Sequence, residues 1–350
     1  MGNGFSTAMD TLQVIKGRRF DGPRRLDLPL TKDELEVRLL SAWCGRVVGC
    51  MLESADTTVM ATGVSEISKL ISALPNEHLD DTILSLITLE KYGPDVTTRN
   101  IADMWLHFLD ERLRSGAEHT AYRNLVSGAQ PSQSAVAENP FREWNGAHKR
   151  ADIFGYVCPG NPELAAEMAH RDAIISHSGN GIYSSMFVAA LISAAFSLHD
   201  IESAIRVAYS EIPSDCGLAE MVHTILKWRV LDYKWSDMLL LFREKWGGLH
   251  ARHSIHSLGR VVLALLQGDG DLIQSIRLLV DSGVAIDAGL ATVGSVCGAM
   301  EGSTQWLKRW IGVVNRDVPT GLRGQDKLSL PDLAERTRDV CLSIQASYAD

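Results

Sequence analysis

Two adjacent aspartates, Asp80 and Asp81, stand with Thr82 at the start of an expected helix, and a third carboxylate, Asp287, stands in a loop bounded by glycines. Oxygen ligands gathered at a helix start suit a hard cation such as Mg²⁺. The same aspartates also suit N-capping, because they satisfy free N–H groups and favour the helix dipole. A lone loop aspartate is typical of a turn. Only proximity of all three in the fold would make them a site, and both interpretations stay open.

The most unusual composition lies between residues 139 and 188, where polar residues and glycines replace the Leu, Val and Ala of a plain core. Glycines let a backbone approach a ligand closely, and His and Asn side chains hydrogen-bond hydroxyl or phosphate groups. Aromatic rings there suit stacking on a base. The candidate ligand contacts are His177, Gly179, Asn180, Gly181, Tyr183, Phe154, Tyr156 and Asp152. In the alternative, structural interpretation, Arg150 and Asp152 form internal ion pairs and Trp144 belongs to the core.

Apolar residues recur with helical period from Leu35 onward. A broad apolar stripe covers residues 35–48, and a capped final helix is expected from Leu330. Between them, helices are expected at residues 82–92, 99–114, 163–173, 182–198, 201–211, 218–230, 235–246, 254–267, 272–281 and 291–300. The last of these is rich in small residues and suits close helix packing. No run alternates strictly enough to predict a strand, so the sequence predicts an all-α fold, a single orthogonal helical bundle.

Composition and charge exclude several classes of protein. Hydrophobic residues make up 45% and charged residues 22% of the chain, as in an ordinary globular protein with a large core. The net charge of −9 argues against nonspecific binding of nucleic acid. No apolar run reaches the roughly 18 residues that a membrane-spanning helix needs. Six cysteines without a CxxC pair indicate reduced thiols in a cytoplasmic protein rather than a zinc site.

Residues 1–32 are expected to form a flexible leader, and residues 33–350 the helical domain. The leader begins MGNGFS, which matches the pattern for N-myristoylation of Gly2. A basic cluster is the usual second signal beside a single acyl chain. Basic residues do follow, at Lys16, Arg18, Arg19, Arg24 and Arg25. This predicts peripheral membrane contact in a eukaryotic host cell, as for an effector delivered by a bacterium; a solvated tail is the alternative.

Residues 139–156 read NPFREWNGAHKRADIFGY, residues 171–183 read RDAIISHSGNGIY, and residues 45–52 read GRVVGCML. Together with the aspartate segments, they resemble the ADP-ribosylglycohydrolase family, whose members are helical enzymes that cut a ribose C1 bond with a magnesium pair. The similarity is densest in the central segments and continues more weakly from Leu35 to Met300. The resemblance implies the orthogonal all-α bundle of that family as the fold.

The resemblance fails at several metal-ligand positions. Leu79 stands where a polar ligand is expected, and Ala285 replaces the first aspartate of the second site. The glutamate expected beyond residue 52 is out of register, and Glu53 is a candidate substitute. Loss of anionic ligands leaves a divalent ion poorly neutralised, so a two-metal site is not expected. The resemblance implies one Mg²⁺ ion or none, with Asp80, Asp81 and Asp287 as its ligands.

The resemblance implies hydrolysis of the glycosidic bond at ribose C1 in ADP-ribosylated or related N- or O-ribosyl substrates. Its catalytic carboxylates would come from Asp80, Asp81, Asp287 and Glu53, one of them serving as general base. The partner would be an ADP-ribose-like small molecule or an ADP-ribosylated protein. The lost ligands favour an alternative, a catalytically inactive relative that binds the same group. A third interpretation is a metal-free transfer or cyclisation in the same pocket.

Overall fold

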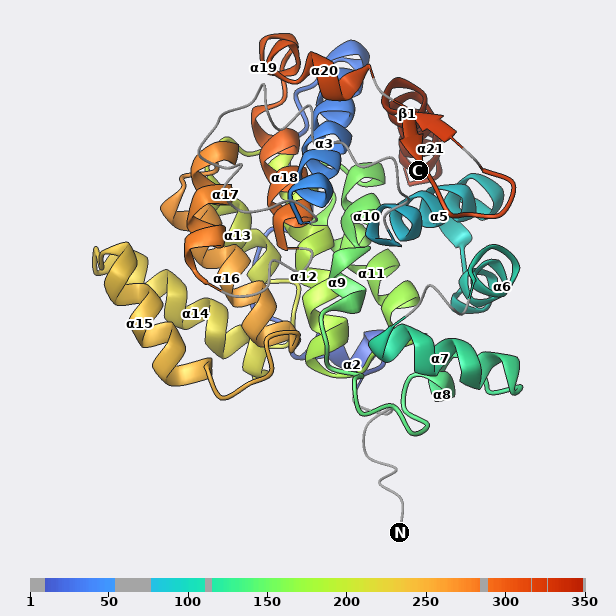
Figure 1. Cartoon of the computed structure of the whole chain (residues 1–350), viewed down its shortest axis with the longest axis horizontal. Helices are drawn as coiled ribbons and strands as arrows, with labels where there is room; N and C mark the ends of the chain where they lie inside the picture. The colour runs from blue at the N-terminus through green and yellow to red at the C-terminus, as the bar shows by residue number, and fades with distance from the viewer. Residues whose placement is uncertain are drawn as a thin grey trace.

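The computed structural model describes residues 10–53, 77–110, 115–283, 289–315, 317–325 and 327–348. The described chain is almost entirely helical, which confirms the all-α prediction (Figure 1). Its first part contains α2 (Leu12–Gly17), α3 (Lys32–Glu53), α5 (Glu77–Tyr92), the 3-10 helix η2 (Gly93–Asp95), α6 (Thr98–Phe108), α7 (Gly116–Val126), α8 (Pro131–Ser134), α9 (Gly146–Lys149), α10 (Asp152–Val157) and α11 (Pro162–Ala173). Then follow α12 (Asn180–Ala195), α13 (Ile201–Tyr209), α14 (Gly217–Val230), α15 (Trp235–Trp246), α16 (Ser254–Gln267), α17 (Leu272–Asp281), α18 (Gly289–Glu301), α19 (Thr304–Arg309), α20 (Ile311–Val314), β1 (Asp317–Pro319), β2 (Lys327–Ser329) and α21 (Leu330–Ser347).

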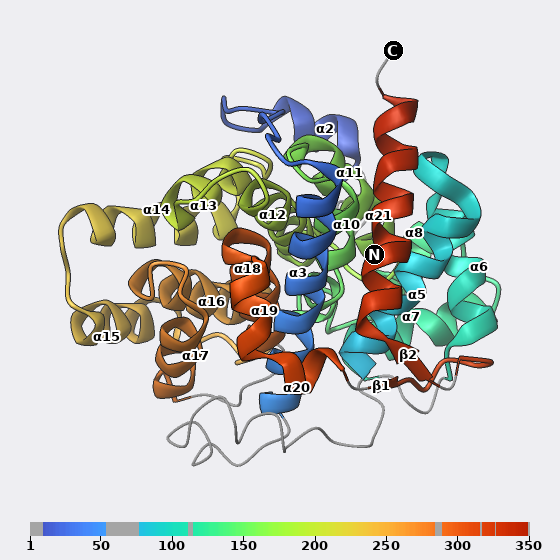
Figure 2. The same ribbon diagram turned by 90° about the horizontal axis from the view of Figure 1, so that it is seen from above.

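The centre of the core is α12. Every residue of this helix after Asn180 is buried, as expected for a helix that is apolar on all sides. It packs against α9, α10, α11 and α13 on one part of its surface and against α16 and α18 on another (Figures 1 and 2). The short helices α9 and α10, which carry much of the central sequence segment, therefore pack against the buried central helix.

Helices α3 and α18 lie in backbone contact (Figure 2). A Cβ atom at Gly45 would overlap the carbonyl of Gly294, and one at Gly294 would overlap the carbonyl of Gly45. Gly49 and Gly298 make equally close approaches, to Leu290 and to the backbone of Ser41. The glycine at these positions is thus required by packing, because any side chain would separate the two helices.

Several helices begin or end where the sequence predicts. The bounds of α15, α16 and α17 are the expected ones, and Asp271 caps α17 by accepting from the Gln274 N–H at 2.8 Å. Thr97 and Asn100 form the capping box at the start of α6. This helix ends earlier than expected, at Phe108, because Leu109 adopts an extended backbone.

Residues 10–31, which belong to the predicted leader, pack against the helical domain. Ile15 of α2 is fully buried, and the Leu26 N–H donates to the Gly160 carbonyl at 2.8 Å. The basic side chains form internal ion pairs: Lys16 with Glu163 and Glu167, Arg18 with Asp215, Arg19 with Glu163 and Glu211, and Arg24 with Glu211. These four residues are thus committed to the fold rather than to an open basic cluster. Gly2, the candidate acylation site, lies outside the described residues.

A short hairpin precedes α21, although no run of the sequence alternates strictly enough to predict a strand. Strands β1 and β2 pair antiparallel, with Asp317 opposite Ser329. Each strand has only three residues, too few for an alternating pattern to show in the sequence. The loop between them reaches α5, where the Gly321 N–H donates to the Asp80 carboxylate.

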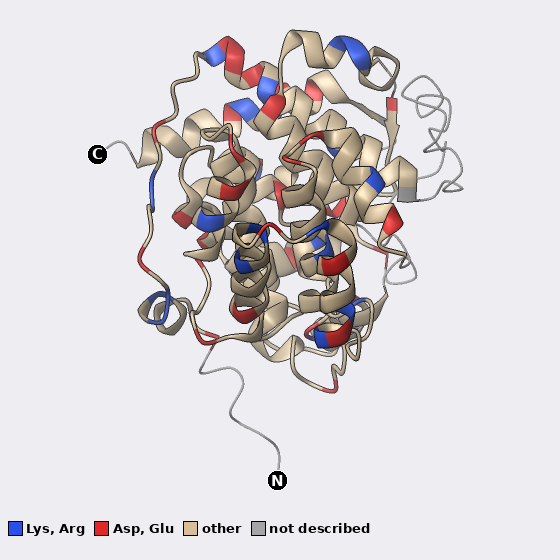
Figure 3. Cartoon of the chain, turned by 90° about the vertical axis from the view of Figure 1, so that its left-hand side faces the viewer, with Lys and Arg blue, Asp and Glu red and all other residues tan. Residues whose placement is uncertain are grey.

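Acidic and basic residues are interspersed on the side of the molecule that carries α14 and α15 (Figure 3). Ion pairs on that side include Arg229 with Asp269 at 2.6 Å and Lys245 with Glu220 at 2.8 Å. Among the described residues, no helix is both long and apolar enough to span a membrane.

Candidate functional site

One pocket collects polar side chains from α5, α7, α9 and the segments beside them. Its lining residues are Glu77, His78, Asp81, Ser115, Gly116, Ala117, Glu118, Trp144, Asn145, Gly146, Lys149 and Arg252. The empty space is about 430 Å³, the open mouth included. Acidic, basic and aromatic groups thus face one space, as in sites that bind small polar molecules.

Arg46 positions two of the helices that contribute to this lining, α5 and α9. Its side chain is fully buried in α3, and its Nη2 atom donates to the carbonyls of His78 at 2.7 Å and Lys149 at 2.6 Å. Its Nη1 atom pairs with Asp152, which is also fully buried. Arg46 of α3 therefore links the start of α5 to the end of α9 through hydrogen bonds to both.

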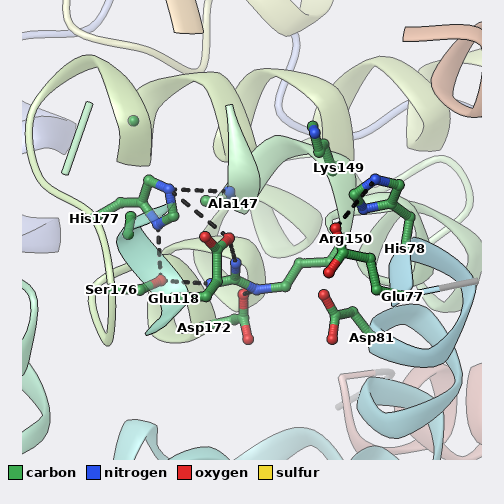
Figure 4. Close-up of polar contacts among 12 residues, drawn as sticks. Glu77, His78, Asp81, Glu118, Ala147, Lys149, Arg150, Asp172, Ser176 and His177 are labelled. Atoms are coloured by element: carbon green, nitrogen blue, oxygen red, sulfur yellow. Dashed lines mark hydrogen bonds and ion pairs between the residues drawn. The ribbon is translucent and has the colours of Figure 1, made fainter. Parts of the chain in front are cut away.

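Arg150 is the buried cation beneath the pocket (Figure 4). It donates to Asp172 Oδ2 at 2.6 Å, to Glu118 Oε1 at 2.8 Å and to Ser176 Oγ at 2.9 Å. Burial alone would lower the pKa of Arg150, but the charges of Asp172 and Glu118 raise it, so the guanidinium stays protonated. Asp81 adds a further negative charge near this guanidinium. The pocket floor is thus an ionic network with fixed geometry.

Asp80 and Asp81, adjacent in α5, have different surroundings. The Asp80 carboxylate is buried and accepts from the Gly321 N–H at 3.1 and 3.0 Å, one distance for each oxygen. Asp81 faces the pocket beside the Arg150 side chain (Figure 4). Thr82 donates to the His78 carbonyl within its own helix at 3.1 Å. The structure thus brings Asp81 alone of the two predicted aspartates into the pocket.

Two further predicted carboxylates cannot be placed. Asp287 lies outside the described residues, and the structure describes the backbone of Glu53 but not its side chain. Within the described part of the chain, no group of three or more His, Cys, Asp or Glu side chains is arranged to hold a metal ion. The predicted metal set of Asp80, Asp81 and Asp287 includes a residue outside this part of the chain and so stays a prediction.

His177, a predicted ligand contact, lies behind the pocket lining. Its ring is fully buried, with Nδ1 at 2.7 Å from Ser176 Oγ, and its Nε2 accepts from the Ala147 N–H at 3.3 Å. The same Nε2 lies 4.0 Å from Glu118 Oε1. Burial and the nearby Arg150 charge hold the pKa of His177 well below its usual range, so the imidazole is neutral. In the described structure it accepts a hydrogen bond from α9, at the Ala147 N–H.

The glycine-rich segment after His177, which is predicted to contact a ligand, contacts other parts of the protein and does not line this pocket. Gly179 has a φ of +52° and donates its N–H to Asp10 at 3.1 Å, and Tyr183 donates its hydroxyl to the same carboxylate at 2.9 Å. Asn180 donates to Glu143 at 2.8 Å and accepts from the Leu218 N–H at 3.0 Å. Gly181 is needed because a Cβ would lie 2.6 Å from the Arg142 carbonyl.

The residues predicted in α10 are also structural. Phe154 and Tyr156 are enclosed in the core and cannot stack on a ligand base. The Tyr156 hydroxyl donates to Ser295 Oγ at 2.7 Å, and Ser295 in turn donates to Asp152. Asp152 is occupied by Arg46, as the structural interpretation of this segment holds. These three side chains link α10 to α3 and α18.

Sequence reasoning missed several residues that line the pocket, above all Glu118, Trp144, Lys149 and Arg252. The Trp144 ring stacks on His250, with centroids 4.6 Å apart and planes 3° apart. Trp144 was a signal in the sequence but was interpreted as core. Glu118 stands in an ordinary helical context, so only the fold shows that it reaches the pocket.

Comparison with known proteins matches the ADP-ribosylglycohydrolase family model to residues 31–344. Among solved structures, the chain is similar to one described as an ADP-ribosylglycohydrolase-related protein complex, with a TM-score of 0.57 and 17% identity. That match covers 90% of this chain and 99% of the other, and at this identity it shows the fold alone. No curated protein matches the sequence. Because the family model covers nearly its whole length, the chain belongs to the ADP-ribosylglycohydrolase family.

Proposed function

We propose that this chain hydrolyses the glycosidic bond at ribose C1 of ADP-ribosylated or related substrates in the pocket of Asp81. Family membership supports a glycohydrolase-like function. The observation that carries the proposal is the position of Asp81, which faces a pocket also lined by Lys149 and Arg252. Basic side chains suit the two phosphates of ADP-ribose. A carboxylate suits the positive charge that develops on a ribose whose C1 bond is breaking.

In the proposed reaction, the oxygen of a water molecule bonds to C1 while the bond from C1 to the leaving nitrogen or oxygen breaks. The electron pair of that bond goes to the leaving atom, which takes a proton. Asp81 orients the water and stabilises the cationic ribose, a role in which a preorganised charge is effective because it needs no rearrangement. The buried network around Arg150 keeps the pocket floor rigid during this step.

The described donors do not fit a magnesium pair. Asp80 accepts hydrogen bonds from Gly321, and Leu79, at a position where a polar ligand is expected, is buried in the core. No step of the proposed reaction runs through a metal. The predicted alternative, a single Mg²⁺ ion held by Asp80, Asp81 and Asp287, is tested below by comparing activity with Mg²⁺ and with EDTA.

A second candidate function is binding of ADP-ribose without cleavage. The observation that favours it is the enclosed Asp80 carboxylate, which in this fold supports the hairpin loop at Gly321. Both candidate functions use the same pocket. Only the hydrolase would release ADP-ribose from a substrate, so an assay of turnover distinguishes the two.

The test measures release of ADP-ribose from an arginine-linked and a serine-linked ADP-ribosylated peptide, with Mg²⁺ and with EDTA. Calorimetry of free ADP-ribose gives binding in the same buffers. We expect Asp81→Asn to lower turnover by about 100-fold or more, whereas Asp103→Asn on the exposed face of α6 leaves it unchanged. Asp80→Asn keeps an oxygen for Gly321 and is expected to retain most activity. Binding without any turnover would favour the second candidate, and loss of activity with EDTA and in Asp80→Asn would show that a metal is required.

A further inference from the structure

A second carboxylate shares the pocket with Asp81. Glu118 lies in the first turn of α7 and lines the same space, with a side chain that is 13% exposed. It comes from α7, whereas Asp81 comes from α5. Figure 4 shows Asp81 and Glu118 both beside the Arg150 side chain. The pocket therefore has two acidic groups held by separate elements.

The Glu118 carboxylate is fixed in position. Its Oε1 atom accepts from Arg150 Nη1 at 2.8 Å, a charge-assisted bond to a buried cation. The chain leaves room for it at Gly146, where a Cβ atom would overlap the carboxylate. Among the described residues, its Oε2 atom accepts no hydrogen bond. One oxygen is thus anchored, and the other is available to a molecule in the pocket.

Neither His177 nor Asp172 can replace Glu118 as a proton acceptor that faces the pocket. His177 is close, at 4.0 Å, but its neutral imidazole already accepts from the Ala147 N–H and contacts Ser176. Asp172 is fully buried beneath Arg150 and does not line the pocket. Glu118 is the acidic group that both bonds to Arg150 and lines the pocket.

We propose that Glu118 is the general base of the reaction, with Asp81 as the second carboxylate; this inference rests on the proposed function. Paired carboxylates are the usual equipment for cleaving a glycosidic bond through a cationic sugar. The water oxygen bonds to C1, its proton passes to Glu118 Oε2, and the C1 bond to the leaving atom breaks with its electron pair going to that atom. The leaving atom takes a proton from solvent, and Glu118 later releases its own to solvent, so charge and protons balance.

The test compares Glu118→Gln with Glu163→Gln on the arginine-linked and serine-linked peptides. Glu163 is a matched control, because it also lies in the first turn of a helix and pairs with an arginine, Arg19, at 2.8 Å, yet it is remote from the pocket lining. The amide of Glu118→Gln still offers an oxygen to Arg150. We expect kcat to fall by about 100-fold or more while the Kd of ADP-ribose changes less than about threefold. The acidic limb of the kcat–pH profile should disappear, and Glu163→Gln should match the wild type.

Glu118→Asp provides a second variant if the glutamine variant folds poorly. It keeps the charge next to Arg150 but retracts the carboxylate by one methylene, so kcat should fall while the acidic limb remains. A parallel change in kcat and Kd, or an unchanged pH profile in Glu118→Gln, would show a structural role and overturn the proposal. Inactive Asp81→Asn together with active Glu118→Gln would overturn the role of Glu118 alone. Absence of turnover in the wild type on both peptides would overturn the proposed function and this inference with it.

Discussion

Arg46 and Asp152 form an ion pair in which both side chains are completely enclosed, one in α3 and the other at the start of α10. The same guanidinium also holds the carbonyls of His78 and Lys149. A buried pair of this kind gives little net stability over an apolar pair, but losing one partner leaves an uncompensated charge. The contact therefore specifies the arrangement of α3, α5, α9 and α10 around the pocket.

Removal of the Arg46 charge is expected to be severely destabilising. Arg46→Met leaves Asp152 buried without its partner, which should lower the free energy of unfolding by about 3–5 kcal/mol in denaturant titrations. The double variant Arg46→Met/Asp152→Leu removes both charges and should recover part of this loss. Recovery stays incomplete because the carbonyls of His78 and Lys149 lose their donor. Equal losses in the single and double variants would contradict this account.

The hydrogen bonds between Asp80 and Gly321 should contribute measurably to the free energy of unfolding. Asp80→Ala leaves the Gly321 N–H without its charged acceptor, and we expect a loss of about 1.5–3 kcal/mol together with faster hydrogen exchange at the Gly321 amide. Asp103→Ala, which breaks an exposed pair with Arg99, is the control and should cost less than about 1 kcal/mol. Unchanged exchange at Gly321 would show that Asp80 does not hold the hairpin loop.

Acid should destabilise the protein partly through His170. Burial holds the pKa of His170 below its usual value of 6.5 in the folded state. Between the lowered pKa and that value, the unfolded chain binds a proton that the folded chain does not, so stability falls as pH falls. The groups facing the ring include Asp10, Glu167 and Arg171.

His170→Gln keeps a donor for the Asp10 carbonyl, which lies 2.7 Å from Nε2, but does not titrate. The difference in unfolding free energy between wild type and variant should therefore shrink as pH falls from 7.5 to 5. A difference that stays constant over this range would refute the assignment. All other titrating groups are common to both proteins and cancel.

The contact between α3 and α18 predicts a strong dependence on glycine. Gly294→Ala places a methyl group against the Gly45 backbone and should cost about 1–3 kcal/mol or more, since neither backbone can move far. Gly17→Ala at the end of α2 is the control, because the space beside it is open. There the substitution should be neutral or stabilise by up to about 1 kcal/mol. A tolerated Gly294→Ala in thermal unfolding would mean that the two helices are not in backbone contact.

Helices were predicted well where one apolar face repeats without interruption, as in α15, α16 and α17. Packing of residues 10–31 was not predictable in the same way. Arg18 and Asp215 pair across 197 positions, and the sequence near Arg18 contains no trace of that partner. Local pattern shows which residues are helical, but it does not show which distant surface a basic segment meets.

The candidate site was also predictable only where local sequence pattern was sufficient. Asp81 was found because a signature places two aspartates at a helix start, yet the sequence could not show that Asp80 turns to Gly321 and Asp81 to the pocket. Phe154 and Tyr156 looked like ligand contacts because aromatic rings beside glycines serve both cores and pockets. Glu118 was missed because its role depends on Arg150 and on the missing side chain at Gly146, a relationship that exists only in three dimensions.

The pairing of α3 with α18 also determines when the protein can fold during synthesis. Arg46 emerges early, but α18 ends at Glu301 and α21, which also packs on α3, ends at Ser347. Contacts between segments so far apart in sequence form late, because the intervening chain must first be ordered. During synthesis α3 therefore lacks these partners until α18 and α21 have emerged, and until then its apolar face is exposed to chaperones and proteases.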